Sequence, residues 1–372
     1  MRPPPPREVV ITGTFDVRNY GDLLFPLIAA DRLAEHGILI RPASPTGRST
    51  GWKDAPAPEP LFGALYGPRP FDGLMIGGGN IVHNRAVTLP DYADVADHAY
   101  GALWIEASVA ARRRNTPIVW NAPGVPHPFD DDADLARSVA ALADYCAVRD
   151  RFSAENLAPV PVSVVPDTAL GLARLWSRAS LAADFRAMLH RLDAPGDTRF
   201  AAIHVKERSV AGPVETLAPA IDAFAARTGL VPILIGIGAC HGDDAAAAHL
   251  ARSLSRRCLD LSVPVGLREI AAAIAWSELY VGASMHGHVT ATAYGRPGTI
   301  VGHPRIPKMS GLLAHLGRPQ DEVSDWSAAL SRATAEPAAS AGVPGPVRDA
   351  LDAHWHDVAR TLCRRRPTPS GA

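Results

Sequence analysis

The chain has 372 residues, of which 47% are hydrophobic and 20% charged, and its formal net charge is −1. This composition is ordinary for a folded protein of about two domains, and the charge excludes a strongly basic nucleic-acid-binding protein. The four cysteines are scattered without a CxxC pair, which argues against a disulfide framework or zinc knuckle and fits a reducing, cytoplasmic compartment. No apolar run reaches the roughly 18 residues of a membrane span, so we expect no integral membrane segment.

Short apolar runs alternate with helical segments through the first half of the chain. The predicted strands are 8–13, 38–41, 71–76, 116–121, 144–148 and 160–165, and the predicted helices are 23–36, 103–115 and 134–142. Residues 43–70 are rich in Pro, Gly and Ser and are predicted to be a long irregular crossover. This βαβα alternation is typical of a parallel sheet covered by helices.

The same alternation restarts after a polar helical passage over residues 175–196. Strands are predicted at 200–205, 231–237, 258–261, 278–281 and 299–301, with helices at 214–227, 245–256, 267–275 and 288–294. The sequence therefore predicts an α/β fold of two Rossmann-like domains with parallel sheets, facing each other across a cleft. The predicted domains are residues 1–170 and 171–346, followed by a C-terminal helix and flexible tail over 347–372.

The turn at Ser284–His288 joins an apolar strand to a helix of small residues. Such a turn lies at the carboxyl edge of a sheet, where free helix N–H groups bind anions. We expect Ser284, His286 and His288 to share that edge, with His286 as the candidate acid/base. From spacing alone, an ordinary turn with a capping Ser284 and two solvated histidines is an equally good interpretation.

Other polar turns follow the predicted strands in both halves. Gly77-Gly78-Gly79-Asn80 comes directly after a strand, which indicates either a ligand close to the backbone or a turn required by packing. Arg149, Lys206 and Lys308 add cations to the same edges, which suits a phosphorylated anionic substrate. The histidines His83, His98 and His127 lack the spacing of a metal site, so we predict no metal.

These motifs, taken in order, resemble the polysaccharide pyruvyltransferase family. The matching stretches are Asn19-Tyr20-Gly21-Asp22, Gly77-Gly78-Gly79-Asn80, Val148-Arg149-Asp150, Val165-Pro166-Asp167-Thr168-Ala169, Ile203-His204-Val205-Lys206, Ser284-Met285-His286-Gly287 and Lys308. The resemblance implies a GT-B-like fold. It also implies transfer of the enolpyruvyl unit of phosphoenolpyruvate to two sugar hydroxyls as a pyruvate ketal, with release of phosphate.

The resemblance also implies roles for individual residues. The acid/base is His286, and the residues expected to bind substrate are Asn19, Asp22, Gly78, Gly79, Asn80, Arg149, Lys206, Ser284 and Lys308, with Arg208 a weaker candidate. The N-terminal domain is then the acceptor side and the C-terminal domain the donor side. Asp22 is alternatively a helix cap, and Asp167 is expected to fix the interdomain strand. Phosphoenolpyruvate is a donor substrate, and no cofactor is implied.

Two departures from the family pattern leave other functions open. The position two residues before His286 is usually Arg but is Ser284 here, and Lys206 stands where the family has Arg, which loses the bidentate guanidinium. One alternative is a GT-B glycosyltransferase using a nucleotide sugar, although Asp260 and Glu269 are unconvincing partners for a ribose. The other is a catalytically silent homologue that binds a saccharide.

Overall fold

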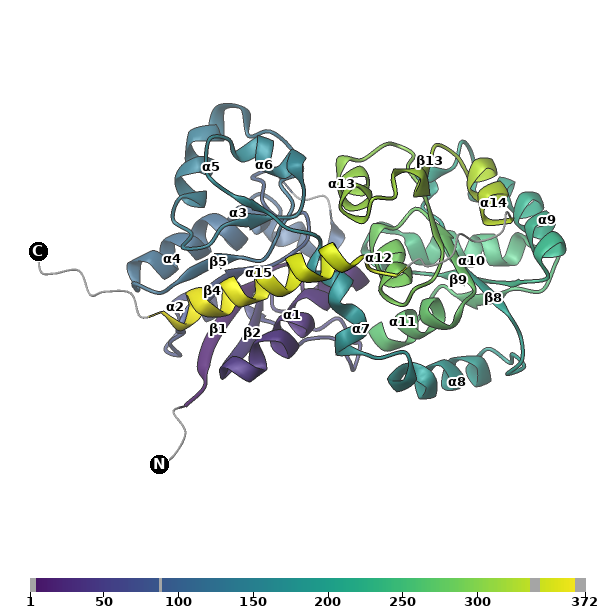
Figure 1. Cartoon of the computed structure of the whole chain (residues 1–372), viewed down its shortest axis with the longest axis horizontal. Coiled ribbons are helices and arrows are strands. Elements are labelled where there is room, and N and C mark those ends of the chain that lie inside the picture. The colour runs from purple at the N-terminus through teal and green to yellow at the C-terminus, as the bar shows by residue number, and fades with distance from the viewer. Residues whose placement is uncertain (1–4, 87–88, 335–341, 365–372) are drawn as a thin grey trace, which may run out of the picture.

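Two parallel β-sheets form the cores of two domains that lie side by side (Figure 1). The computed structural model describes residues 5–86, 89–334 and 342–364. Residues 365–372 of the predicted flexible tail lie outside this described part. Within it, no helix is both long enough and apolar enough to cross a bilayer.

The first sheet has the strand order β3-β2-β1-β4-β5, and all of its neighbours are parallel. Its strands are β1 (Arg7–Thr12), β2 (Ile38–Ser44), β3 (Glu59–Pro60), β4 (Gly73–Ile76) and β5 (Ile118–Trp120). Successive side chains of β1 point to opposite faces and enter two different cores, which is why the strand reads as a continuous apolar run. The helices that follow these strands are α1 (Tyr20–Leu33), α2 (Leu61–Tyr66), α3 (Ala99–Gly101) and α4 (Ala107–Arg113).

The prediction of an irregular crossover over residues 43–70 is wrong in part. Strand β2 continues to Ser44, and β3 and α2 both lie inside this stretch. Helix α2 forms because Leu61, Ala64 and Leu65 fall on one helical face and are all buried against the sheet. The sequence did not predict this short helix because the proline and glycine that flank it are typical of turns and loops.

A separate two-stranded sheet follows the first one. It pairs β6 (Ala147–Val148) with β7 (Ser163–Val164), which are much shorter than the strands predicted there. Helices α5 (Ala133–Ala140) and α6 (Arg151–Leu157) flank β6, and α7 (Leu172–Leu175) leads away from the domain. The helical passage predicted over 175–196 is mainly α8 (Ala182–Arg191).

The second sheet has the order β10-β9-β8-β11-β12-β13, again entirely parallel. Its strands are β8 (Phe200–His204), β9 (Val231–Ile235), β10 (Leu259–Leu261), β11 (Leu279–Gly282), β12 (Gly298–Val301) and β13 (Glu322–Val323). Its helices are α9 (Ala218–Thr228), α10 (Asp243–Ser253), α11 (Leu267–Trp276), α12 (Met285–Ala293), α13 (Pro307–Leu316) and α14 (Trp326–Thr334). The central strands β8 and β11 are buried throughout, as expected for a sheet covered on both faces.

The last helix, α15 (Gly345–Cys363), crosses back from the second domain and packs on the first, where it is yellow in Figure 1. Its His354 is buried and bonds on both sides, from Nδ1 to the Tyr145 hydroxyl at 2.9 Å and from Nε2 to Asn121 Oδ1 at 3.0 Å. Leu351, Val358 and Leu362 complete the core beneath the first sheet.

This buried histidine makes stability fall in acid. Burial, with a smaller effect of Arg32, lowers the pKa of His354 from 6.5 to about 3. The folded state then binds fewer protons than the unfolded chain between these values, so stability is lost as the pH falls through 6.5 toward 3. At pH 5 the loss is about 2 kcal/mol. We expect urea unfolding at pH 7 and pH 5 to show a smaller acid loss in His354→Gln than in the wild type. An equal loss in both would contradict this assignment.

A loop of the first domain makes hydrogen bonds to the second domain. Asp54, which follows β2, accepts hydrogen bonds from the backbone N–H groups of Leu267 at 3.0 Å and Arg268 at 2.8 Å, and so caps α11 across the domain boundary. The Trp52 indole donates to the Pro264 carbonyl oxygen at 3.2 Å. A Cβ at Gly266 would come within 2.4 Å of Asp54, so only glycine leaves room for this cap.

Candidate active site

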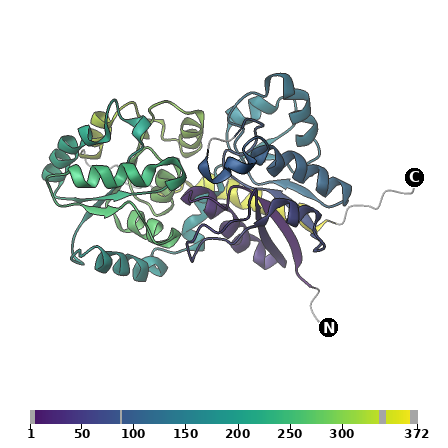
Figure 2. The ribbon, with the colours of Figure 1, turned by 180° about the vertical axis from the view of Figure 1, so that it is seen from behind.

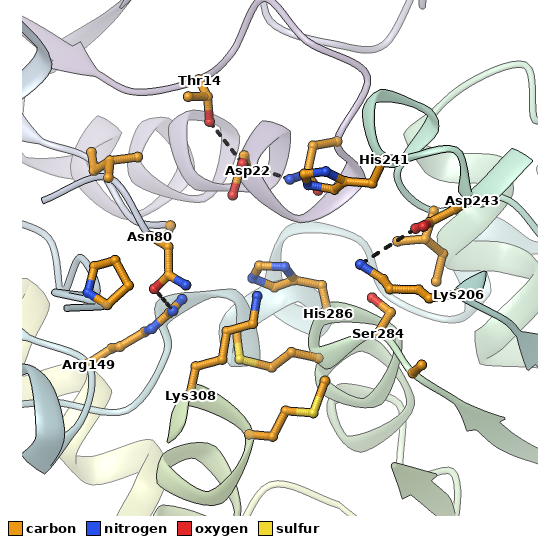
Figure 3. Close-up of a pocket in the computed structure, with 18 of the residues that line it drawn as sticks. Thr14, Asp22, Asn80, Arg149, Lys206, His241, Asp243, Ser284, His286 and Lys308 are labelled. Carbon is orange, nitrogen blue, oxygen red and sulfur yellow. Dashed lines mark hydrogen bonds and ion pairs between the residues drawn. The ribbon is translucent and has the colours of Figure 1, made fainter. Parts of the chain in front are cut away.

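A cavity of about 270 Å³ lies between the two domains, at the carboxyl ends of the strands of both sheets (Figure 3). Strand order reverses between β1 and β4 in one sheet and between β8 and β11 in the other, and such switch points open crevices for ligands. The predicted site residues that line the cavity are Asn19, Asp22, Gly79, Asn80, Arg149, Lys206, Ser284, His286 and Lys308.

Of the predicted substrate-binding residues, Gly78 does not line the cavity. A Cβ at this position would come within 2.4 Å of the Phe25 ring, so Gly78 allows the turn to pack on α1. Its neighbour Gly79 does face the cavity, with φ of +91°, and a Cβ there would meet Asp22 Oδ1 at 2.9 Å. Backbone conformation and crowding therefore both require glycine at position 79.

Asp22 presents a carboxylate on the first-domain side of the cavity. Its Oδ2 accepts hydrogen bonds from Thr14 Oγ1 and from Asn19 Nδ2, both at 2.8 Å. The N-cap residue of α1 is Asn19, so Asp22 lies in the first turn and is not the helix cap. With Oδ2 occupied, Oδ1 is left to accept a hydrogen bond from a ligand hydroxyl.

His286 projects from α12 across the domain boundary. Its ring nitrogen Nδ1 packs against Gly21 of α1, where a Cβ would come within 1.7 Å of it. The ring meets Phe25 edge-on at 5.7 Å, and its Nε2 faces Asp167 Oδ2 at 3.6 Å. Nε2 and Asp167 Oδ2 are both buried and make no hydrogen bond within the described residues. Asp167 is therefore the charged group that Nε2 faces, while Nδ1 lies on the side of Gly21.

Asp167 is ionised behind this histidine. Burial alone would raise its pKa, but the facing His286, together with Arg149, holds the pKa below its usual value. Arg149 Nη1 lies 3.8 Å from Asp167 Oδ2, and its Nη2 donates to Asn80 Oδ1. The carboxylate thus connects the imidazole to a guanidinium at the cavity wall. Such a carboxylate orients a neighbouring histidine and stabilises its charged form.

Two lysines complete the cationic side of the cavity. Lys206 Nζ lies 3.8 Å from Asp243 Oδ2, which also bonds His204 Nε2 at 2.9 Å. Lys308 makes no ion pair anywhere in the described part of the chain. Burial, reinforced by repulsion from Arg149 and Lys206, lowers its pKa to about 7. An anion in the cavity would relieve that repulsion.

Comparison with known proteins decides the family. The family model for polysaccharide pyruvyl transferase matches residues 19–304. The chain belongs to the polysaccharide pyruvyl transferase family. No curated protein matches it.

Solved structures resembling this pyruvyl transferase family member include two UDP-N-acetylglucosamine 2-epimerases. The UDP-GlcNAc 2-epimerase of Neisseria meningitidis bound to UDP-GlcNAc is 12% identical, with a TM-score of 0.56, over 95% of this chain and 100% of that one. The UDP-N-acetylglucosamine 2-epimerase of Rickettsia bellii is 11% identical, with a TM-score of 0.57, over 96% of both chains. At these identities the likeness shows the fold alone, and it confirms the GT-B-like prediction.

Several lining residues of this family member were not among the predicted binding residues. They are Thr14, His83, Tyr100, His127, His241 and Asp243. His241 and Asp243 follow strand β9, so the rule that polar turns at strand ends form the site would have found them. His83 lies beside His127, with ring centroids 6.2 Å apart, and burial lowers the pKa of His83 to about 4. No group of three or more metal-ligand side chains gathers within the described residues.

Ser284 and His288 show how α12 presents its residues. Ser284 Oγ accepts a hydrogen bond from Gly287 N at 3.3 Å, so it caps the helix while lining the cavity. The expectation that His288 lies at the same edge is wrong. It is 1% exposed and packs against Gly298 of β12, and burial lowers its pKa to about 3.

Proposed function

We propose that this protein transfers the enolpyruvyl unit of phosphoenolpyruvate to two hydroxyls of a saccharide, forming a pyruvate ketal and releasing phosphate. The observation that carries the proposal is the position of His286. It lies between the cations Arg149, Lys206 and Lys308 and the acceptor-side carboxylate Asp22, in a cavity lined by residues of both domains. Membership of the pyruvyl transferase family supports the same reaction.

The cationic half of the cavity suits the donor. Phosphoenolpyruvate carries a carboxylate and a phosphate, and charge-assisted hydrogen bonds from lysine and arginine hold such groups tightly. Lys308 has no ion-pair partner of its own among the described residues, so its charge is available to an anion. As the C–O bond to phosphate breaks, the same cations stabilise the leaving group.

In this proposal His286 acts as both the general base and the general acid. Nδ1 takes the proton of one acceptor hydroxyl, whose oxygen bonds to C2 of the enol, and passes that proton to C3, so the methylene becomes a methyl group. In the second step a neighbouring hydroxyl bonds to C2, the bond between C2 and the phosphate oxygen breaks, and the hydroxyl proton leaves with phosphate. Asp167, whose Oδ2 faces Nε2 at 3.6 Å, acts as a positioning residue whose negative charge stabilises the protonated imidazole.

The glycosyltransferase alternative finds less support in this site. Glu269, one of the acidic residues considered for a ribose, instead accepts hydrogen bonds from Val265 N at 2.7 Å and Arg191 Nη2 at 2.6 Å. Asp260 accepts one from Ser262 N at 2.9 Å. Neither lines the cavity.

Calorimetric titration with phosphoenolpyruvate tests the proposal, run beside UDP-, GDP- and CMP-sugars. We expect saturable binding of phosphoenolpyruvate that Lys206→Ala weakens at least tenfold. Arg227→Ala, which removes an exposed cation of α9 remote from the cavity, is the matched control and should bind normally. Binding of a nucleotide sugar without any heat from phosphoenolpyruvate, with or without that sugar present, would count against the donor assignment.

A further inference from the structure

Helices α2 and α4 lie at the end of the first domain that faces away from the second (Figure 1 and Figure 2). Phe62 and Tyr66 of α2 are 48% and 46% exposed, and their rings stack with centroids 6.3 Å apart. Val109 of α4 is 38% exposed. The Tyr66 hydroxyl donates to Glu106, the residue directly before α4, and so connects α2 to the start of that helix. We refer to Phe62, Tyr66, Val109 and the arginines that end α4 as the α2–α4 surface.

Three consecutive arginines, Arg112, Arg113 and Arg114, lie at the C-terminal end of α4. None of them forms an ion pair within the part of the chain that the structure describes, and Arg113 and Arg114 are exposed. Arg113 and Arg114 lie near enough to oppose the rise in the pKa of Tyr66 that burial and Glu106 cause. The Arg114 guanidinium also lies over the ring of the buried Phe71, 5.2 Å from the ring centroid. Arg112 and Arg113, which have no such partner among the described residues, therefore lie on the same surface as the apolar side chains.

Exposed apolar side chains and unpaired arginines on one surface are more informative together than either kind of residue is alone. Single exposed apolar residues are common on soluble proteins, and arginines often end helices because they complement the helix dipole. Here the apolar side chains share one surface with three arginines, although the whole chain has a net charge of only −1. The three arginines therefore make the α2–α4 surface locally basic.

We propose that the α2–α4 surface docks on a membrane whose lipids are anionic. Phe62, Tyr66 and Val109 would enter the boundary between headgroups and acyl chains, and Arg112 and Arg113 would bind lipid phosphates. Rings with one polar end suit this boundary, and each arginine near an anionic leaflet strengthens adsorption. Since no described helix can cross the bilayer, the contact is peripheral.

Charge distinguishes this partner from a second copy of the chain. A symmetric dimer through the α2–α4 surface would gather Arg112, Arg113 and Arg114 of both copies into one interface. Glu106 is the acidic residue bonded within this surface, and its hydrogen bond to Tyr66 already engages it. An anionic leaflet instead offers a negative charge to every arginine.

Vesicle sedimentation of the full chain tests the proposal. We expect the protein to sediment with vesicles of phosphatidylglycerol and phosphatidylcholine but not with phosphatidylcholine alone, and to be released by salt. Phe62→Ser with Val109→Ser, and separately Arg112→Gln with Arg113→Gln, should each lower the partition coefficient at least tenfold. The control is Val263→Ser with Val265→Ser, which removes two side chains that are 66% and 62% exposed on the second domain. It should bind as the wild type does.

Unchanged melting temperatures will establish that each variant is folded. The proposal fails if the protein binds neither vesicle, if it binds both equally, or if the control loses binding as strongly as the surface variants do. It also fails if sedimentation equilibrium finds a dimer that Phe62→Ser with Val109→Ser converts to a monomer, because the surface would then belong to a second copy.

Discussion

His286→Gln is expected to lower kcat at least about 1,000-fold while changing the affinity for phosphoenolpyruvate little, since general acid–base catalysis contributes about 10²- to 10⁴-fold and one group serves two proton transfers. Glutamine fills similar space beside Gly21 and cannot carry the proton. Phosphate release from phosphoenolpyruvate, with a saccharide acceptor identified by screening, measures the effect. His249→Gln on α10 is the control, because His249 is exposed and lies away from the cavity.

Separate substitutions of Asp167 and Asp150 distinguish a positioning role of Asp167 at His286 from the general effect of removing a carboxylate near Arg149. Both carboxylates lie near Arg149, at 3.8 Å and 3.6 Å, but only Asp167 faces His286. We expect Asp167→Asn to lower kcat about 10- to 100-fold with a small change in KM, because the charge that stabilises the imidazolium is lost. Asp150→Asn should keep its cap on Ser153 N and nearly full activity. Equal losses in both variants, or full activity of His286→Gln, would overturn this account of the acid/base.

Lys308 is expected to make the binding of phosphoenolpyruvate depend strongly on pH. With a pKa of about 7, its amine is mostly neutral above that pH in the free protein. A bound phosphate favours the charged form, so the complex must take up a proton when it forms above pH 7. We expect affinity for phosphoenolpyruvate to fall as the pH rises from 7 to 9. At pH 8 the calorimetric enthalpy should vary with the ionisation enthalpy of the buffer.

Lys308→Met should remove this proton uptake and weaken binding at pH 7 at least about tenfold, the effect of one charge-assisted contact. The same change should raise the melting temperature of the free protein at pH 7, since the buried cation no longer has to be held among Arg149 and Lys206. Binding that is flat between pH 7 and 9, or proton uptake that persists in Lys308→Met, would contradict the assignment.

The sequence was enough to predict strand ends and the side chains that follow them. Asp22, Gly79, Lys206 and His286 belong to four different strand-end turns, and parallel sheets bring such turns to one edge. It is harder to predict from the sequence which side of a helix each residue faces. Helix α12 begins at Met285 rather than at His288, so His286 and His288 differ by about 200° around the axis. That rotation turns His286 to the cavity and His288 to the sheet.

Contacts between segments far apart in the chain could not be predicted from the residue pattern of a single sequence. Nothing in the spacing of residues indicates that Asp167 lies behind His286, because their approach depends on how the two domains close. The stretches around β6 and β7 look like full strands because they are apolar, yet they form only a two-residue ladder. An amphipathic pattern likewise predicted helix α15 without indicating which domain it would cover.

Helix α15 has a consequence for biosynthesis. The first domain lacks Leu351, Trp355 and Leu362 until helix α15 has been made, so part of its hydrophobic core stays open while the second domain is translated. The domain begun first is therefore finished last. A ribosome that stops before residue 345 would release a complete second domain joined to a first domain with an exposed apolar face, the kind of surface that chaperones bind.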